Sequence, residues 1–311
     1  MSNFYHVSVL LDECLEGLDI KPDGIYVDGT LGGAGHSSQI AKRLTTGRLI
    51  GIDRDPVALK AAGERLAPYA DRVTLVHSNF CEIAQVLKDL GIDGVDGILL
   101  DLGVSSPQLD DGSRGFSYMA DAPLDMRMNN EDVLSAYDVV NSWSFEELKR
   151  ILYDYGEERY APRIASAICA RREQKPIETT LELVEIIRGA MPAAALREKQ
   201  HPAKRSFQAI RIAVNDELGS VEKVMRDAIP CLNPGGRLAI ITFHSLEDRI
   251  VKNGMADAAK GCTCPPSFPV CVCGKKPQVK LITRKPIVSG DEELERNPRA
   301  RSAKLRVCEK M

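Results

Sequence analysis

A glycine-rich segment followed by a single acid is the part of this 311-residue sequence best suited to chemistry. The apolar run 25–27 leads into Asp28 and the glycine cluster 29–35, and Asp53 ends the next apolar run. A strand, a glycine loop, a helix and a second strand ending in an acid are the parts of a nucleoside-binding β-α-β unit. We therefore expect a nucleoside cofactor here, with a plain glycine-rich turn as the alternative.

The glycine spacing separates two classes of cofactor. From Gly33 the sequence reads Gly-Ala-Gly-His-Ser-Ser, which lacks the third glycine of the dinucleotide fingerprint G-x-G-x-x-G. S-adenosylmethionine carries no phosphates and requires only a close backbone approach and a carboxylate for its ribose hydroxyls. We expect S-adenosylmethionine, and a nicotinamide dinucleotide is the alternative.

A second loop with chemical potential follows the apolar run 97–100. Asp101 ends this run and leads into a polar segment that contains Ser106, Pro107 and Gln108. The methyl group of S-adenosylmethionine is already activated, so the enzyme needs mainly to hold the acceptor atom in line with it. An acceptor amine is a poor nucleophile, and oxygen atoms that accept hydrogen bonds from its hydrogens would assist it. We therefore predict that Asp101, Ser106 and Pro107 position an acceptor amine. A simple turn is the alternative for the Ser-Pro segment.

Short apolar runs alternate with helical patterns through the first hundred residues, which is typical of parallel β-α-β winding. Ligands of such sheets bind beyond the carboxyl ends of the strands, which places both loops in one region. The expected strands are 25–28, 48–53, 73–77 and 95–101, and the expected helices lie near 36–44, 56–66 and 81–90.

The alternation stops after residue 106, and the following hundred residues favour helices. Capping boxes begin at Ser144 and Thr179, each with a glutamate three residues later. Apolar residues from Phe207 to Met225 recur at spacings of three and four, which predicts one long helix. Further strands are expected at 237–243, 279–283 and 304–307, the last two as antiparallel edge strands, with a helix at 245–255.

These elements predict an α/β protein, namely a Rossmann-like sheet interrupted by an all-helical domain. The sheet domain is expected at 1–106 and 206–311, and the helical insert, which would recognise substrate, at 107–205. The second part of the sheet domain contains a cysteine-rich loop at 262–273.

The net charge of −3 conceals an uneven distribution. Residues 159–211 and 275–311 each contain eleven Lys or Arg against five Asp or Glu, which leaves −15 on the remainder. Basic segments on an acidic body suit localised contact with RNA phosphates, with solvated helix faces as the alternative. The candidate phosphate contacts in the insert are Arg159, Arg163, Arg171, Arg172, Lys204 and Arg205.

The remaining composition bounds the compartment and the partners. No apolar run approaches the ~18 residues of a membrane span, and the N-terminus lacks the pattern of a secretory signal. Nine mostly scattered cysteines fit a reducing compartment better than a disulfide scaffold. We expect a cytoplasmic protein without a membrane partner, and the acidic remainder argues against DNA.

Four of the cysteines lie within twelve positions, at 262, 264, 271 and 273. Four clustered thiolates can close a tetrahedral zinc site. The C-x-C spacing is tighter than the usual C-x2-C, and three prolines stiffen the intervening loop. A zinc site and a loop of reduced thiols both stay open, so the sequence alone assigns no metal.

Taken together, the long motifs resemble those of the RsmH family, also called MraW, whose members are 16S rRNA cytosine-N4 methyltransferases. The resemblance spans nearly the whole chain, and several of its blocks are long and rare. It implies a class I methyltransferase sheet, an inserted helical domain, and a target cytidine in the decoding region of small-subunit rRNA. The matching blocks are 28–36, 53–56, 101–111, 114–117, 123–128, 155–159, 243–249 and 297–302.

The resemblance also implies which residues hold S-adenosylmethionine. The glycine segment should approach its methionine and ribose part, Asp53 its ribose hydroxyls and Phe80 its adenine. Asp101 and Gln108 should line the donor near the methyl group. The implied cofactor-binding residues are Ala34, Gly35, His36, Asp53, Phe80, Asp101 and Gln108.

Other readings of the residues remain open. A nicotinamide-dependent oxidoreductase uses the same β-α-β unit but leaves the 101–111 loop without a purpose. A non-catalytic RNA-binding module would use the basic insert and the cysteine loop and need no cofactor. Residue chemistry alone also allows methylation of DNA, of free nucleosides or of another RNA base.

Overall fold

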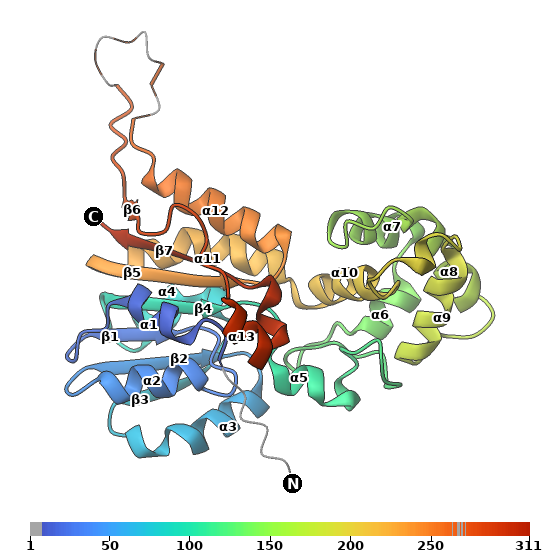
Figure 1. Cartoon of the computed structure of the whole chain (residues 1–311), viewed down its shortest axis with the longest axis horizontal. Helices are drawn as coiled ribbons and strands as arrows, with labels where there is room; N and C mark the ends of the chain where they lie inside the picture. Colours follow the sequence, from blue (N-terminus) through green and yellow to red (C-terminus); the bar gives the residue numbers. More distant parts are fainter. Residues whose placement is uncertain (1–7, 263, 266–267, 269, 271) are drawn as a thin grey trace. The chain divides into compact units, whose positions relative to one another are not determined.

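The computed structural model (Figure 1) describes residues 8–262, 264–265, 268, 270 and 272–311, without the side chains of Ser106 and Pro107. The chain divides into two compact units. Met1–Gly103 and Leu218–Met311 form the first, here called the sheet unit, and Val104–Glu217 form the second, here called the helical unit.

A seven-stranded sheet in the order β3-β2-β1-β4-β5-β7-β6 forms the sheet unit. The strands from β3 to β5 pair in parallel, whereas β7 pairs antiparallel with both β5 and β6. The predicted α/β fold is therefore confirmed, and β1 to β4 have the predicted bounds. The strands are β1 (Ile25–Asp28), β2 (Arg48–Asp53), β3 (Val73–His77), β4 (Val95–Asp101), β5 (Leu232–Thr242), β6 (Val279–Leu281) and β7 (Lys304–Lys310).

Two apolar cores cover the two faces of this sheet. Val27 and Ile98 belong to one core, which α4, α11 and α12 complete. Their neighbours Tyr26 and Leu99 belong to the other core, which α1, α2 and α3 complete. Burial on both faces explains why these strands are continuous apolar runs. The helices are α1 (Leu11–Leu18), α2 (Gly35–Arg43), α3 (Pro56–Leu66), η1 (Ala67–Tyr69), η2 (Phe80–Glu82), α4 (Ile83–Asp89), α11 (Glu217–Cys231), α12 (Ser245–Ala259), α13 (Asp291–Arg296) and η5 (Pro298–Ser302).

The helical unit has an apolar core of its own. Both predicted capping boxes are present, since Ser144 and Thr179 each accept a hydrogen bond from the backbone of the glutamate three residues later. Its helices are α5 (Ser106–Asp110), η3 (Gly112–Arg114), α6 (Ala136–Ser142), α7 (Phe145–Asp154), α8 (Ala161–Arg172), α9 (Thr180–Ala190), η4 (Ala195–Arg197) and α10 (Lys204–Asn215).

The prediction of one long helix from Phe207 to Met225 is wrong. The helix α10 ends at Asn215, Asp216 has a left-handed φ of 46°, and α11 starts at Glu217. The Asn215 side chain accepts a hydrogen bond from Met128 N–H at 2.8 Å, which ties the end of α10 to a distant loop of the same unit. The apolar periodicity continues across this break, so periodicity alone could not reveal it.

The break also moves the domain boundary. Phe207, Ile210 and Val214 of α10 pack in the core of the helical unit, so this unit extends to Glu217 instead of residue 205. It begins at Val104 instead of residue 107. Within the described residues, no helix has the length and apolar character needed to cross a membrane.

Candidate active site

Three neighbouring strands of the sheet unit each end in an aspartate. Asp53 ends β2, Asp28 ends β1 and Asp101 ends β4, and these strands are adjacent and parallel. The sheet topology therefore collects three carboxyl groups at one edge, the edge at which ligands of such sheets bind. Asp53 and Asp101 were predicted as site residues. Asp28 was not predicted to have a function of its own in the site.

Asp28 shapes the glycine loop that follows β1. Its carboxylate is buried and accepts hydrogen bonds from Thr30 N–H at 3.1 Å and from the Ser37 hydroxyl at 2.7 Å. Thr30 Oγ1 in turn accepts a hydrogen bond from Asp101 N–H at 2.5 Å. Through these bonds the loop is tied to the start of α2 and to the end of β4.

The backbone geometry of the glycine loop explains why small residues are required in it. Ala34 has a left-handed φ of 55° and stands directly before α2. A Cβ atom added to Gly35 would lie 1.9 Å from Ser8 Oγ, so this position accommodates a close chain approach. A Cβ atom added to Gly33 would meet nothing within 4 Å, which leaves the backbone of this residue accessible to a ligand.

Asp53 holds the other side of the loop. Its Oδ2 accepts a hydrogen bond from Gly32 N–H at 2.7 Å, and its Oδ1 accepts one from Asp55 N–H at 2.8 Å. Burial is the main reason that the pKa of Asp53 is raised to about 6. Each carboxylate oxygen has a further lone pair, so the loop contacts and ribose hydroxyls can be accommodated together. Only the structure shows that Asp53 also fixes the glycine loop by hydrogen bonds.

Asp101 has one of the unsatisfied polar atoms in this region. Its Oδ1 is buried and has no hydrogen-bond partner among the described residues. Burial, with smaller contributions from the charges of Asp28 and Glu247, raises the pKa of Asp101 to about 8. A buried oxygen with no partner among the described residues is costly in the empty protein, and a bound cation or amine donor would relieve that cost.

His36 is buried at the start of α2 beside this carboxyl group. Its Nε2 donates a hydrogen bond to the carbonyl of Val9 at 3.0 Å, since a carbonyl can only accept. Its Nδ1 lies 3.9 Å from Asp101 Oδ2, which is too far for a direct hydrogen bond. The imidazole thus binds the chain before α1, while the backbone of His36 remains part of the glycine loop.

Phe80 begins η2 and lies against the glycine loop. A Cβ atom added to Gly29 would lie 3.1 Å from Phe80 Cβ, so the aromatic residue and the loop are in contact within one unit. Phe80 is half-buried and also packs against the core formed with α4 and α11. It therefore serves the core and borders the predicted cofactor site.

The predicted site residues after Asp101 belong to the helical unit. Gln108 in α5 is buried, and its Oε1 accepts a hydrogen bond from Ser105 N–H at 3.0 Å. Ser106 and Pro107 start the same helix, and their side chains lie outside the described part of the structure. Their predicted positioning of an amine therefore stays a prediction.

His244, which follows β5, belongs to the same edge of the sheet unit. Neither of its ring nitrogens has a hydrogen-bond partner among the described residues, although Nε2 lies 3.1 Å from Glu247 Oε1. The other oxygen of Glu247 accepts hydrogen bonds from the backbone N–H groups of Phe243 and His244, at 3.0 and 3.3 Å. Glu247 therefore caps α12, a function for which the sequence offered only its position three residues after His244.

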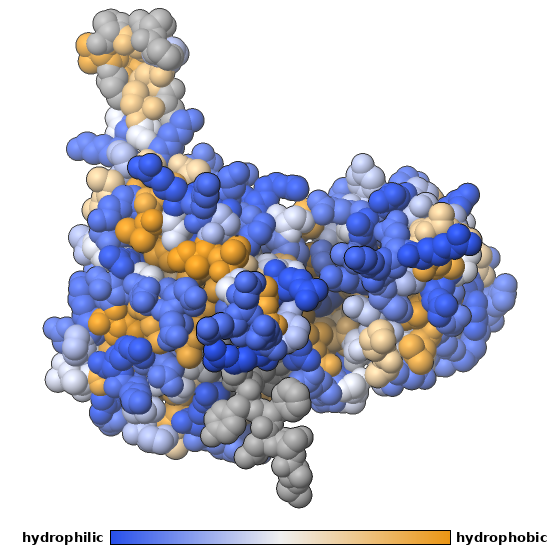
Figure 2. Space-filling model, in the orientation of Figure 1, coloured by the Kyte–Doolittle hydropathy of each residue, from blue (hydrophilic) through white to orange (hydrophobic). Residues whose placement is uncertain are grey.

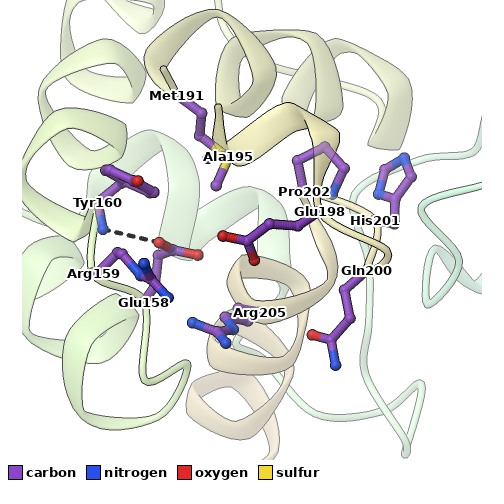
Figure 3. A pocket seen from close by; sticks show the side chains of 10 residues that line it. All are labelled: Glu158, Arg159, Tyr160, Met191, Ala195, Glu198, Gln200, His201, Pro202 and Arg205. Atoms are coloured by element: carbon purple, nitrogen blue, oxygen red, sulfur yellow. Dashed lines mark hydrogen bonds between the residues drawn. The ribbon is translucent and has the colours of Figure 1, made fainter. Parts of the chain in front are cut away.

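A pocket in the helical unit brings two of the predicted phosphate contacts together (Figure 3). Arg159 and Arg205 line it with Glu158, Glu198 and Tyr160, and the figure shows both guanidinium groups on the same side as Glu158. Glu158 is buried and accepts a hydrogen bond from Tyr160 N–H at 2.9 Å. The two carboxylates moderate the positive charge of this pocket.

The other predicted phosphate contacts differ in how exposed they are. Arg163 and Lys204 are exposed on α8 and α10. Arg172 Nη1 donates to Val140 O at 2.7 Å and Arg171 Nη1 donates to Lys175 O at 3.3 Å, so these two arginines also stabilise the unit.

Comparison with known proteins decides the family. Residues 3–311 match the model of the MraW methylase family. The chain belongs to this family.

Curated relatives of this MraW family member are similar over their whole length. The chain is 63% identical over 310 residues to a protein of Brevibacillus brevis and 59% identical over 310 residues to one of Heliobacterium modesticaldum. It is 61% identical over 309 residues to one of Clostridium botulinum strain Kyoto. Each alignment covers 99% of both chains, and each relative is named ribosomal RNA small subunit methyltransferase H.

The predicted family, enzyme class and cofactor are thereby confirmed: this MraW family member is an S-adenosylmethionine-dependent methyltransferase. The sheet unit fits that cofactor, because S-adenosylmethionine carries a sulfonium cation and Asp101 offers a buried oxygen that no described residue contacts through a hydrogen bond. The open space at Gly33 and the acidic strand ends fit the same molecule.

Proposed function

We propose that this enzyme methylates the exocyclic N4 amine of a cytidine in the decoding region of 16S rRNA within the small ribosomal subunit. The observation that carries the proposal is the Asp101 carboxyl group, which lies beside the glycine loop and whose Oδ1 is buried with no partner among the described residues. The names of the curated relatives support small-subunit rRNA as the substrate class.

Seven residues are proposed to hold the cofactor, with Asp53 on the ribose hydroxyls and Phe80 beside the adenine. When bound, S-adenosylmethionine supplies a methyl group activated by its sulfonium. The fixed glycine loop and the strand-end carboxyl groups orient it in advance, which lowers the entropic part of the barrier. The proposed cofactor residues are Ala34, Gly35, His36, Asp53, Phe80, Asp101 and Gln108.

Asp101 is proposed to orient the acceptor amine and to take up its proton. The N4 amine is a poor nucleophile because its lone pair is delocalised into the ring, and a carboxylate oxygen that accepts one of its hydrogens localises that pair on nitrogen. A carboxyl group whose pKa is raised to about 8 is a much stronger base than an exposed aspartate. A neighbouring cation favours its ionised form, so cofactor binding prepares the base. Ser106 and Pro107 are proposed to position the same amine.

The helical unit is proposed to bind the phosphate backbone around the target. Arg159, Arg163, Lys204 and Arg205 are available to phosphates without rearrangement of the core of this unit. A target base must be unstacked before its amine can reach a pocket, and assembled subunits present such nucleotides in a defined single-stranded form. We therefore infer that small subunits are better substrates than free 16S rRNA, and that the enzyme works in the cytoplasm.

Transfer of labelled methyl groups from S-adenosylmethionine to small subunits that lack the modification tests this function. Nucleoside mass analysis should identify N4-methylated cytidine, and free 16S rRNA should react more slowly. Asp101→Asn serves as the matched inactive control. Label on another base would refute the N4 assignment, and absence of both transfer and cofactor binding would favour a non-catalytic RNA-binding module. Equal rates on subunits and free rRNA would refute the preference for subunits.

A further inference from the structure

The chain between α12 and β6, residues 260–278 and here called the cysteine loop, carries a cluster of thiols outside the active site. Figure 1 shows it rising from the sheet unit as two neighbouring segments. Three of its described cysteines, Cys262, Cys264 and Cys273, have Sγ atoms within 4.8 Å of one another. Cys271 lies outside the described residues.

The sulfur positions match the geometry of a metal site. Cys262 Sγ and Cys273 Sγ are 3.7 Å apart, which is too long for a disulfide bond. Two sulfurs bound to one tetrahedral zinc ion at about 2.3 Å lie about 3.8 Å apart. Cys273 Sγ donates a hydrogen bond to Cys262 Sγ at this distance, and the separation also equals one edge of a tetrahedral thiolate site.

Backbone N–H groups hold two of these sulfurs in place. Cys264 N–H donates to Cys262 Sγ at 3.4 Å, and Val272 N–H donates to Cys264 Sγ at 3.3 Å. The sulfur atoms are thus oriented before any ion binds.

The described residues of the cysteine loop pack in neither core of the sheet unit. Its large apolar residues Phe268, Val270 and Val272 are 49%, 71% and 73% exposed, and Figure 2 shows hydrophobic colour on the projecting segment. None of the described cysteines of the loop belongs to either core of the sheet unit. A short segment without a core needs a cross-link, and in a reducing compartment a metal supplies one where a disulfide would not persist.

We propose that Cys262, Cys264 and Cys273 bind a structural zinc ion that fixes the cysteine loop. Each thiol releases a proton when it binds, so zinc affinity falls as the pH is lowered. This site is independent of the proposed methyl transfer. Its ligand is a divalent ion with a preference for thiolates, for which zinc is the common occupant of tetrahedral sulfur sites.

Zinc content of the full-length protein, purified under reducing conditions without a chelator, tests the proposal. We expect about one zinc ion per chain by elemental analysis, with sulfur neighbours at about 2.3 Å by X-ray absorption. Cys262→Ser, Cys264→Ser and Cys273→Ser should each lose the ion to a mild chelator, whereas Cys169→Ser in the helical unit should retain it. Unchanged thermal unfolding of the sheet unit would show that the variants fold. Cys271→Ser reports the fourth position, since its loss of zinc indicates a fourth thiolate.

Limited proteolysis gives a second readout that needs neither activity nor RNA. Chelation should accelerate trypsin cleavage after Lys275 and Lys276 by about tenfold or more in the native sequence, because the loop opens. The triple serine variant should be cleaved rapidly with or without a chelator. A protein that takes up no zinc, or whose zinc uptake and cleavage rate are the same in the triple variant, would overturn the proposal.

Discussion

In the sheet unit the charges of the site are buried or half-buried carboxyl groups at the ends of strands, whereas in the helical unit they are cations on the surface. Asp28, Asp53 and Asp101 lie at one sheet edge, and burial raises the pKa of each. Arg163 and Lys204 are exposed on helices, where water and salt screen them.

This difference teaches how one chain can bind two very different molecules. A small cofactor is held by few groups in a low-dielectric site, so each contact carries a large share of the binding energy. A polyanionic partner is held by many screened contacts, each of which contributes little. Substitutions in the two units should therefore differ in size, in salt dependence and in the step that they affect.

The largest effect is expected for Asp101→Asn. Loss of the carboxylate removes both the proton acceptor and the partner of the acceptor amine, so single-turnover methyl transfer should fall about 100-fold or more. Cofactor binding, measured by calorimetry, should weaken far less. In the native protein kcat/KM should rise with pH up to about 8, because the carboxyl group must be ionised. A residual rate above one tenth would contradict the proposed function of Asp101.

The next largest effect is expected for Asp53→Ala. It removes the proposed acceptor of the ribose hydroxyls and the partner of Gly32 N–H, so cofactor affinity should fall by about 2 kcal/mol, roughly 30-fold. Affinity for small subunits should be unchanged. If the affinities for the cofactor and for small subunits fell equally, Asp53 would stabilise the fold and would not bind the cofactor.

A smaller and favourable effect of Asp101→Asn is expected on the free energy of unfolding. The pKa of Asp101 is about 8 in the folded chain and close to 3.8 when unfolded, so the folded state binds the extra proton between these values and loses stability as the pH rises. Asp101→Asn should therefore raise the free energy of unfolding at pH 8 by about 1–3 kcal/mol. The gain should grow from about pH 5 to about pH 8 in thermal unfolding. Asp12→Asn, at an exposed acid of α1, is the control; a pH-independent gain would contradict the electrostatic explanation.

The smallest effects are expected for single cations of the helical unit. Arg159→Gln, Arg163→Gln and Lys204→Gln should each weaken binding to small subunits a few-fold and reduce the slope of log K against log salt by about 0.7. Lys149→Gln, at an exposed lysine outside the basic segment, should leave the slope unchanged. Cofactor affinity should stay constant throughout. A salt slope unaffected by the first three variants would place the RNA contact elsewhere.

The sequence also predicted the structure of the two units unequally well. The strands β1 to β4 could be located to the residue because each is an apolar run that ends in a polar loop. The helical unit was recognisable from the capping boxes at Ser144 and Thr179, but its end was not. Asn215 stops α10 through hydrogen bonds to Met126 and Met128, which are distant in sequence and therefore leave no local signal.

The sequence predicted which residues belong to the candidate site, but not how they are arranged in space. Asp53 and Asp101 stand out because acids after apolar runs are chemically conspicuous. Asp28 was part of a motif, yet its bonds to Thr30 and Ser37 emerge only when the loop is folded. The cysteine spacing left both zinc and free thiols open, and only the fold shows that three of the sulfurs lie close together.

By itself the sequence determined the family, the alternation of strands and helices, and the residue types that chemistry requires, because these depend on local order along the chain. The tertiary structure alone decided that three strand-end aspartates share one edge, that a buried oxygen of Asp101 has no partner among the described residues, and that three thiols converge. Distances between residues far apart in sequence, and the burial that shifts a pKa, are properties of the packed chain. They decide which of the chemically capable residues can act together.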